Sequence, residues 1–433
     1  MEIYSNNVLP ILYSSKNNYF FIFIFILNYK KSYSINMKNL FLLLIHLFIF
    51  IQSKQIVFPK ANKIKGIIHF INCGRSDSIL IEQNKRYGLV DASYPFLGAK
   101  DVVESLGNRG AKDPDKSVQA VVNYLNYLGV THLDFIIATH AHIDHIGGMP
   151  QIAYHFVDKR TKFYYKKYRI NKNNNEALFN AVYNSMKKKG AQLIDVTGKK
   201  YEFDFEDMHF ELLNTEIHKK EEKRGENQNC IGTLITYKNK RIFLAADLEI
   251  KEDLIYKDYI GKIDALKMAH HGISYSSFDF LNITRPKYTV ITNSQVTDYA
   301  TIPISILQQM FGGKVYYVGG VSKTSKDVAT SAIRLYIYEK LFESSEKKKY
   351  FLQMKNTGGN INVGNNLNGF KTYHTYTFYF ENGKIITGLQ TLNGENGKCR
   401  YYFEPDGHMV KGTCLNIEKK SYCFDNNGCC YDI

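Results

Sequence analysis

The chain has 433 residues, of which 44% are apolar, and a formal net charge of +15. This apolar content is ample for a sizeable core, and a prior of roughly 150 residues per domain suggests two or three domains. A basic chain favours an anionic partner such as nucleic acid, teichoic acid or a membrane surface. Lys, Asn, Ile, Tyr and Phe are abundant throughout and Trp is absent, so the charge alone does not establish nucleic-acid binding.

The first fifty residues contain two apolar runs. Residues 20–27 form a run that is too short to span a bilayer. Residues 40–51 follow a short basic start at Met37 and precede a small residue, Ser53, in a polar stretch, which is typical of a secretory signal. We therefore expect residues 1–53 to be a signal region with Met37 as the initiator, and the mature protein to be secreted. The alternative is an uncleaved membrane anchor.

The next part of the chain alternates between predicted strands and a predicted helix. Strands are expected over residues 64–71, 79–82 and 87–90, the last of them ending at Asp91. Residues 115–128 place apolar side chains at helical spacing and stop at a glycine, as helices commonly do. An apolar, β-branched run over residues 133–138 then predicts a buried strand. Such αβ alternation is typical of an α/β domain.

Four polar residues that favour metal binding follow this strand directly. His140 and His142 are two residues apart on an extended segment, so their imidazoles point the same way and can hold one cation. Asp144 and His145 come from the adjoining turn and can reach a second cation beside it. Three imidazoles and a carboxylate suit zinc, with manganese or iron as alternatives. The sequence therefore predicts a metal site.

A second group of polar residues follows two later strands. Residues 176–189 predict a helix, and the charged stretch 219–228 is interpreted as a solvated loop. Paired strands over 231–237 and 241–245 lead to Asp247, which by itself fits the N-cap of a helix over 250–259. A further strand over 264–268 ends in His270, His271 and a glycine.

The His-x-His-x-Asp-His motif at residues 140–145 resembles that of the metallo-β-lactamase superfamily. The resemblance implies an α/β fold over residues 63–321, an αββα sandwich of two facing sheets with helices outside. It implies that Asp247 bridges two metals and that one histidine of the 270–271 pair is the last ligand. We favour His271 as that ligand and assign His270 to the substrate oxyanion or leaving group, although the sequence does not separate them. Asp91 resembles the aspartate that supports the metal-binding loop.

Two further stretches are similar to one branch of the superfamily. Residues 72–78 and 266–292 resemble the hydrolase domains of DNA-uptake channel proteins and the surface phosphorylcholine esterases, although Ser76 replaces a glycine of that turn. Asp77 belongs either to this motif or to an ordinary turn. Many relatives supply a third histidine to the first metal, and the candidates here are His155, His209 and His218. Otherwise His140, His142, Asp247 and solvent hold that metal.

The expected chemistry is hydrolysis by a hydroxide shared between two metal ions, most simply two Zn²⁺. Two cations lower the pKa of a shared water towards about 7 and neutralise charge on a phosphoryl or acyl oxygen. We expect Asp144, His270 and Glu249 to take part in catalysis, with Glu249 orienting a leaving group or a cationic substrate head. The alternative for Glu249 is an acidic residue in the first turn of a helix.

The C-terminal part contains a degenerate repeat. Residues 355–369 are rich in glycine and asparagine and predict a linker, followed by a module over residues 370–433. An aromatic pair, an acidic turn, a glycine and an apolar strand recur in 379–388, 402–412 and 422–428, which predicts stacked β-hairpins. They resemble choline- and glucan-binding repeats, which bind a quaternary ammonium by cation–π contact or stack on sugar. Since Trp is absent, a purely structural cap is the alternative. Five of the seven cysteines lie in 399–430 and predict disulfides.

Three functions fit these features. The first is a secreted phosphodiesterase similar to phosphorylcholine esterase, acting on a phosphoester and attached by its tail to a carbohydrate or choline-bearing polymer. The second is an extracellular nuclease, with nucleic acid as the substrate. The third is a non-catalytic surface-binding protein, against which the intact ligand positions argue.

Overall fold

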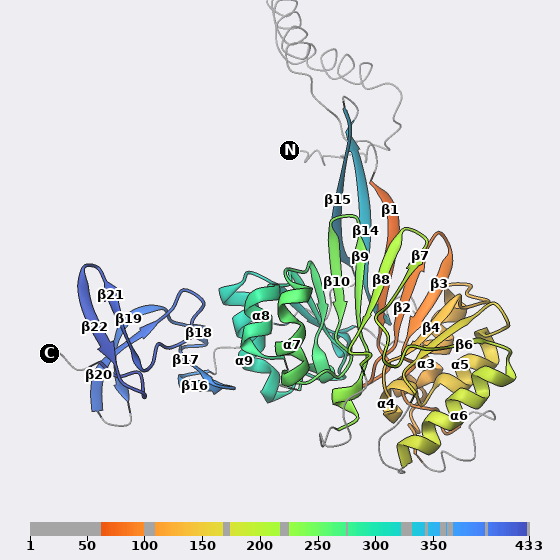
Figure 1. Ribbon diagram of the computed structural model, residues 1–433, viewed down its shortest axis with the longest axis horizontal. Helices are drawn as coiled ribbons and strands as arrows, with labels where there is room; N and C mark the ends of the chain where they lie inside the picture. Colours follow the sequence, from red (N-terminus) through yellow and green to blue (C-terminus); the bar gives the residue numbers. More distant parts are fainter. Residues whose placement is uncertain are drawn as a thin grey trace, which may run out of the picture. The chain divides into compact units, whose positions relative to one another are not determined.

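The structure is a computed structural model that describes most of the chain after residue 61 (Figure 1). The described residues are 62–98, 109–167, 174–216, 225–273, 276–321, 331–342, 345–355, 361, 367–394 and 397–430. The expected signal region, His218 and most of the expected linker lie outside them. Residues 61–340 and 348–433 form one compact unit, and the description below concerns that unit. No helix in the described ranges is long and apolar enough to cross a membrane.

Two mixed sheets form the centre of the fold. The first sheet has the order β15-β14-β1-β2-β3-β4-β5-β6, antiparallel from β14 to β3 and parallel from β3 to β6. Its strands are β1 (Lys63–Ile71), β2 (Ile79–Gln83), β3 (Arg86–Val90), β4 (Phe135–Ala138), β5 (Lys162–Tyr165), β6 (Gln192–Asp195), β14 (Ala332–Phe342) and β15 (Ser345–Lys355). We expected the domain to end near residue 321, but β14 pairs with β1 along residues 63–71, so the sheet continues beyond that point.

The second sheet repeats this division into antiparallel and parallel halves. Its order is β13-β12-β11-β10-β9-β8-β7, antiparallel from β7 to β10 and parallel from β10 to β13. Its strands are β7 (Tyr201–Phe205), β8 (Met208–Leu213), β9 (Gly232–Tyr237), β10 (Lys240–Leu244), β11 (Ala265–Lys267), β12 (Tyr288–Ile291) and β13 (Lys314–Tyr317).

Helices cover the outer face of each sheet (Figure 1). On the first sheet these are α3 (Val118–Tyr127), α5 (Met149–Phe156) and α6 (Asn174–Lys188). On the second they are α8 (Phe278–Thr284) and α9 (Thr301–Ser305), with α7 (Ile250–Ile260) packed against α8. In β4, Phe135 and Ile137 face the core between the sheets, whereas Ile136 and Ala138 face the helices. Because successive strand residues point to opposite faces, both faces of this strand are buried, and the expected αββα sandwich is confirmed.

The C-terminal residues form the predicted hairpins. A small sheet contains β16 (Gly369–Tyr373), β17 (Tyr376–Glu381) and β18 (Lys384–Ile385), and two hairpins follow it. These are β19 (Gly388–Gly394) with β20 (Gly397–Phe403), and β21 (Thr413–Ile417) with β22 (Lys420–Phe424). Two disulfides, Cys399–Cys429 and Cys414–Cys423, stabilise the last part. The prediction of disulfides in this segment is therefore confirmed.

The first of these small sheets packs against helices of the sandwich. Phe378 is fully buried, and its ring lies 5.4 Å from that of Phe278 in α8. The Tyr376 hydroxyl donates to Asp279 over 2.6 Å, and the Tyr373 hydroxyl donates to the carbonyl of Ser276. The sheet therefore closes part of the core beside α8 and α9.

This packing predicts that a mutation in the repeat region destabilises the sandwich. Phe378→Ala should lower the free energy of unfolding by about 3–5 kcal/mol, because it leaves a cavity against α8. Tyr402→Ala, which alters a half-buried ring in β20, is the matched control and should cost much less. Denaturant unfolding followed by near-ultraviolet circular dichroism measures both. Equal unfolding midpoints for the two variants would contradict the packing described.

Candidate metal centre

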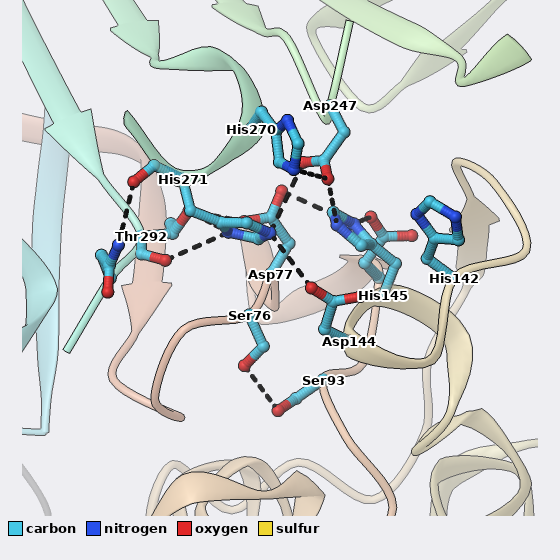
Figure 2. A network of polar contacts seen from close by, with 12 residues as sticks. Ser76, Asp77, Ser93, His142, Asp144, His145, Asp247, His270, His271 and Thr292 are labelled. Atoms are coloured by element: carbon cyan, nitrogen blue, oxygen red, sulfur yellow. Dashed lines mark hydrogen bonds and ion pairs between the residues drawn. The ribbon is translucent and has the colours of Figure 1, made fainter. Parts of the chain in front are cut away.

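The polar residues singled out in the sequence come together where four strands end. β3 leads to Asp91 and β4 to residues 140–145 in the first sheet, while β10 leads to Asp247 and β11 to His270 and His271 in the second. Functional groups in sheets with parallel strands commonly gather at these carboxyl ends. Figure 2 shows that the labelled histidines and aspartates from both sheets point toward one another.

The backbone at these strand ends adopts an unusual conformation. Asp91, Ala246, His270 and His271 have φ angles of 56°, 47°, 47° and 54°. The left-handed region is unfavourable for residues other than glycine, and apart from tight turns it is common at functional sites. It persists here because neighbouring bonds hold it, for example the His270 amide donating to the Ala246 carbonyl over 2.9 Å.

His140, His142 and Asp247 form the first group of possible metal ligands. His140 Nε2 lies 3.0 Å from His142 Nδ1 and 3.9 Å from Asp247 Oδ2. Burial lowers the pKa of both histidines, so both imidazoles are neutral at pH 7, the form that binds metals.

His145, His271, Asp77 and again Asp247 form the second group. His145 Nε2 lies 3.2 Å from Asp247 Oδ2, and His271 Nε2 lies 3.5 Å from Asp247 Oδ1 (Figure 2). Asp144 Oδ2 is 3.4 Å from His271 Nε2. Asp247 therefore belongs to both groups. The alternative that Asp247 is the N-cap of the following helix is wrong, because Glu249 is the N-cap residue of α7.

The groups fit a pair of cations. Nε2 of His145, Nε2 of His271 and Oδ1 of Asp247 are buried, and none has a hydrogen-bond partner among the described residues. A buried polar atom without a partner costs about 1–3 kcal/mol, and a cation bound among these three atoms would remove that cost. Burial acts to lower the pKa of His271, but Asp247 and Asp77 raise it to about 9. The electric field that holds this proton also favours a metal ion.

Asp91 takes the supporting position expected from the resemblance. Its carboxylate accepts from the Thr139 amide over 2.9 Å and from the Thr139 hydroxyl over 2.6 Å. His145 Nδ1 lies 2.7 Å from the same carboxylate, which leaves Nε2 directed at Asp247. His271 is oriented similarly, since its Nδ1 lies 3.1 Å from the Thr292 carbonyl. Such bonds fix which nitrogen of a histidine is available to a metal.

The two adjacent histidines differ in burial. His271 is buried, whereas the His270 side chain is 22% exposed and its Nε2 lies 3.7 Å from Asp247 Oδ2. Burial lowers the pKa of His270 to about 4. His271 thus lies inside the second group, and His270 lies at its solvent-facing edge.

Lys267 is a buried residue of the site that the sequence analysis did not identify. Its Nζ lies 2.5 Å from Asp77 Oδ2, 2.8 Å from the Ala246 carbonyl and 3.9 Å from Asp247 Oδ1. Burial acts to raise the pKa of Asp77, but Lys267 and His271 hold it well below its usual range. Asp77 is therefore part of the cluster and not an ordinary turn aspartate. A lysine within the apolar β11 was the available signal.

Ser76, at the position of the expected glycine, fits the turn. Its hydroxyl donates to the Cys73 carbonyl over 2.8 Å and lies 2.7 Å from the Ser93 hydroxyl (Figure 2). The Asp77 amide donates to the Asp144 carbonyl over 3.2 Å. The turn is thus joined to the metal-binding loop.

Other predicted residues lie away from the cluster. Glu249 Oε2 accepts from Gln228 Nε2 over 2.8 Å, and in the described ranges it makes no hydrogen bond or ion pair with the clustered residues. His209 is half-exposed on β8 beside Asp204, and His155 is exposed at the end of α5. Neither of these histidines contributes to the first group.

The stretch that we interpreted as a solvated loop touches the site. Residues 226–229 are half-buried, and Glu226 Oε1 accepts from the Ala141 amide over 2.8 Å. Burial raises the pKa of Glu226 to about 7. Asn227 Nδ2 lies 3.4 Å from His270 Nδ1. The solvated-loop interpretation is therefore wrong for residues 226–228, because tertiary packing covers a locally polar sequence.

Comparisons with known proteins agree with this geometry. The model of the β-lactamase superfamily domain matches residues 118–269, and that of a choline-binding repeat matches residues 386–428. Recombination protein 2 of Haemophilus influenzae is 25% identical over 104 residues, which are 24% of this chain and 13% of that protein. The chain therefore spans only a small part of that relative's length.

Two solved structures are similar to different parts of the chain. The short form of human tRNase Z has a TM-score of 0.31 and 13% identity, covering 52% of this chain and 91% of its own. A choline-binding domain from Streptococcus pneumoniae has a TM-score of 0.14 and 21% identity, covering 15% of this chain and 96% of its own. The two family matches and the His/Asp cluster show that the chain contains a metallo-β-lactamase superfamily domain, followed by a C-terminal choline-binding repeat.

Proposed function

We propose that this protein is a metal-dependent phosphodiesterase that acts on choline-bearing polymers at the cell surface, similar to phosphorylcholine esterase. The main support is that one chain combines a His/Asp cluster sharing Asp247 with a choline-binding repeat. The repeat implies association with a choline-bearing surface. A hydrolase held there meets phosphodiester-linked choline at high local concentration. Export through the signal region at residues 1–53 belongs to the same proposal.

The proposed ligands divide between two metal positions. His140, His142 and Asp247 hold the first cation, and Asp144, His145, Asp247 and His271 hold the second. Zinc suits the imidazole-rich set best, with manganese or iron as alternatives. When bound, two such cations generate a nucleophile from water near neutral pH and stabilise the charge of the phosphoryl group in the transition state.

The remaining residues orient these ligands and meet the substrate. Lys267 and Thr292 hold Asp77, and Asp91 fixes the ring of His145. His270, at the exposed edge, is placed to donate a hydrogen bond to a substrate oxygen or to the leaving group. Asp144, 3.4 Å from His271 Nε2, is assigned to catalysis as well as to the second metal position. Glu249, whose carboxylate is held by Gln228, is assigned to the cationic head of a choline substrate.

An extracellular nuclease is the second candidate function. It is favoured by the similarity to a recombination protein and by the net charge of +15, since basic proteins bind phosphate backbones through counterion release. The third function, a non-catalytic surface-binding protein, is less well supported, because such a protein would not need buried polar atoms without hydrogen-bond partners in a His/Asp cluster.

A panel of substrates tests the choice between these functions. The zinc-loaded mature protein should hydrolyse p-nitrophenyl phosphorylcholine and leave single-stranded DNA and a β-lactam intact, because only the choline ester matches both the site and the repeat. Released nitrophenol and gel electrophoresis are the measurements. Cleavage of DNA without cleavage of the choline ester would establish the nuclease, and no hydrolysis at all would leave a binding protein.

Removing a shared ligand should be more damaging than removing an unshared one. His142→Ala should lower kcat more than about a hundredfold, or roughly 2.7 kcal/mol, by weakening the first metal position. Asp247→Ala should lower it at least as much, because that carboxylate serves both positions. His209→Ala, which removes a half-exposed histidine on β8, is the control and should retain activity. Full activity of His142→Ala would show that the assigned mechanism is wrong.

A further inference from the structure

The first metal position has fewer protein ligands than the second. His140, His142 and Asp247 converge there, and two of the three histidines considered as an additional ligand lie elsewhere in the fold. Catalytic zinc sites commonly have three protein ligands plus an open position.

The half-buried stretch at residues 226–229 approaches the first position. Glu226 Oε1 accepts from the amide of Ala141, the residue between His140 and His142, over 2.8 Å. Gln228 Nε2 donates to Glu249 Oε2 over 2.8 Å. These two bonds anchor the chain on both sides of Asn227, which begins the short 3₁₀ turn η3 (Asn227–Asn229).

The Asn227 side chain lies between histidines of the site. Its Nδ2 is 3.4 Å from His270 Nδ1, and the side chain also interacts with His142. Its carbonyl oxygen Oδ1 is buried and has no partner in full hydrogen-bond geometry among the described residues, and it is the atom of this amide that faces the imidazole of His142. A buried amide oxygen without a donor is costly. A cation next to the imidazole of His142 would remove that cost.

We infer that Asn227 Oδ1 is a ligand of the first metal, in the place where relatives have a third histidine. This inference rests on the proposed ligand set of His140, His142 and Asp247. The oxygen of an amide carbonyl is a hard, neutral ligand of the kind that Mn²⁺ prefers. An imidazole nitrogen in the same place would favour Zn²⁺. The first position therefore binds zinc less tightly than a three-histidine site and discriminates less against Mn²⁺.

The test measures metal binding on the full chain, without using activity. Zn²⁺ and Mn²⁺ are titrated into the metal-free protein against a chromophoric chelator, and retained metal is counted by elemental analysis after gel filtration. Asn227→Ala should weaken the first metal at least about tenfold, as loss of groups around a metal typically does, while the second metal is retained. Asn227→His should raise the preference for Zn²⁺ over Mn²⁺.

Two controls keep the outcome interpretable. Asn229→Ala changes an asparagine of the same turn whose amide donates to the Gly225 carbonyl, and it should leave both metals in place. Asn227→Asp keeps the side-chain shape and should retain two metals even where Asn227→Ala folds poorly. The inference is overturned if Asn227→Ala binds both metals with unchanged affinity, or if Asn229→Ala loses as much. Asn227-dependent binding of two metals in a protein that cleaves no phosphodiester would sustain this inference and reject the proposed function.

Discussion

Four carboxylates, Asp77, Asp91, Asp144 and Asp247, lie among buried imidazoles at one end of the sandwich, and the cost of burying their charge constrains everything around them. An isolated buried carboxylate is strongly unfavourable unless it is paired. Burial acts to raise the pKa of Asp247, but His145, His271 and Lys267 hold it well below its usual range. Lys267 compensates part of this charge. The buried atoms without a hydrogen-bond partner, among them Asp247 Oδ1, mark where a further positive charge would be favourable. Because cations bound at this cluster would compensate the buried negative charge, metal binding should stabilise the protein.

The fold brings these groups together through the parallel halves of both sheets. Each half ends its strands at the same edge, and the left-handed turns at Asp91, Ala246, His270 and His271 redirect the side chains inward. The core between the sheets and the two helical layers hold those turns in place. A rigid frame of this kind positions ligands more closely than mobile loops do. The turns thus help to fix the positions of the clustered side chains.

Local sequence signals were sufficient for much of this arrangement. An apolar strand followed by spaced histidines predicted a metal site, and the family resemblance that these residues carry implied the sandwich and added Asp247 and His270–His271 to that site. Long-range packing was not visible in the same way. The bond from Thr292 to Asp77 joins residues far apart in the chain, β14 extends the first sheet beyond the expected end, and Asn227 sits in a polar stretch that only tertiary contacts bury. The hairpin repeat was predicted from its period, but the docking of Phe378 beside α8 depends on shape that no local pattern encodes.

A choline-binding repeat and a His/Asp cluster in one chain support the proposed surface hydrolase, whose mechanism depends on two cations that share Asp247. Diffraction from crystals grown with zinc, recorded on both sides of the zinc absorption edge, tests whether two cations share this carboxylate. We expect two anomalous peaks flanking Asp247, one beside His140 and His142 and the other beside His145 and His271. A single peak, or peaks that do not contact Asp247, would contradict this expectation.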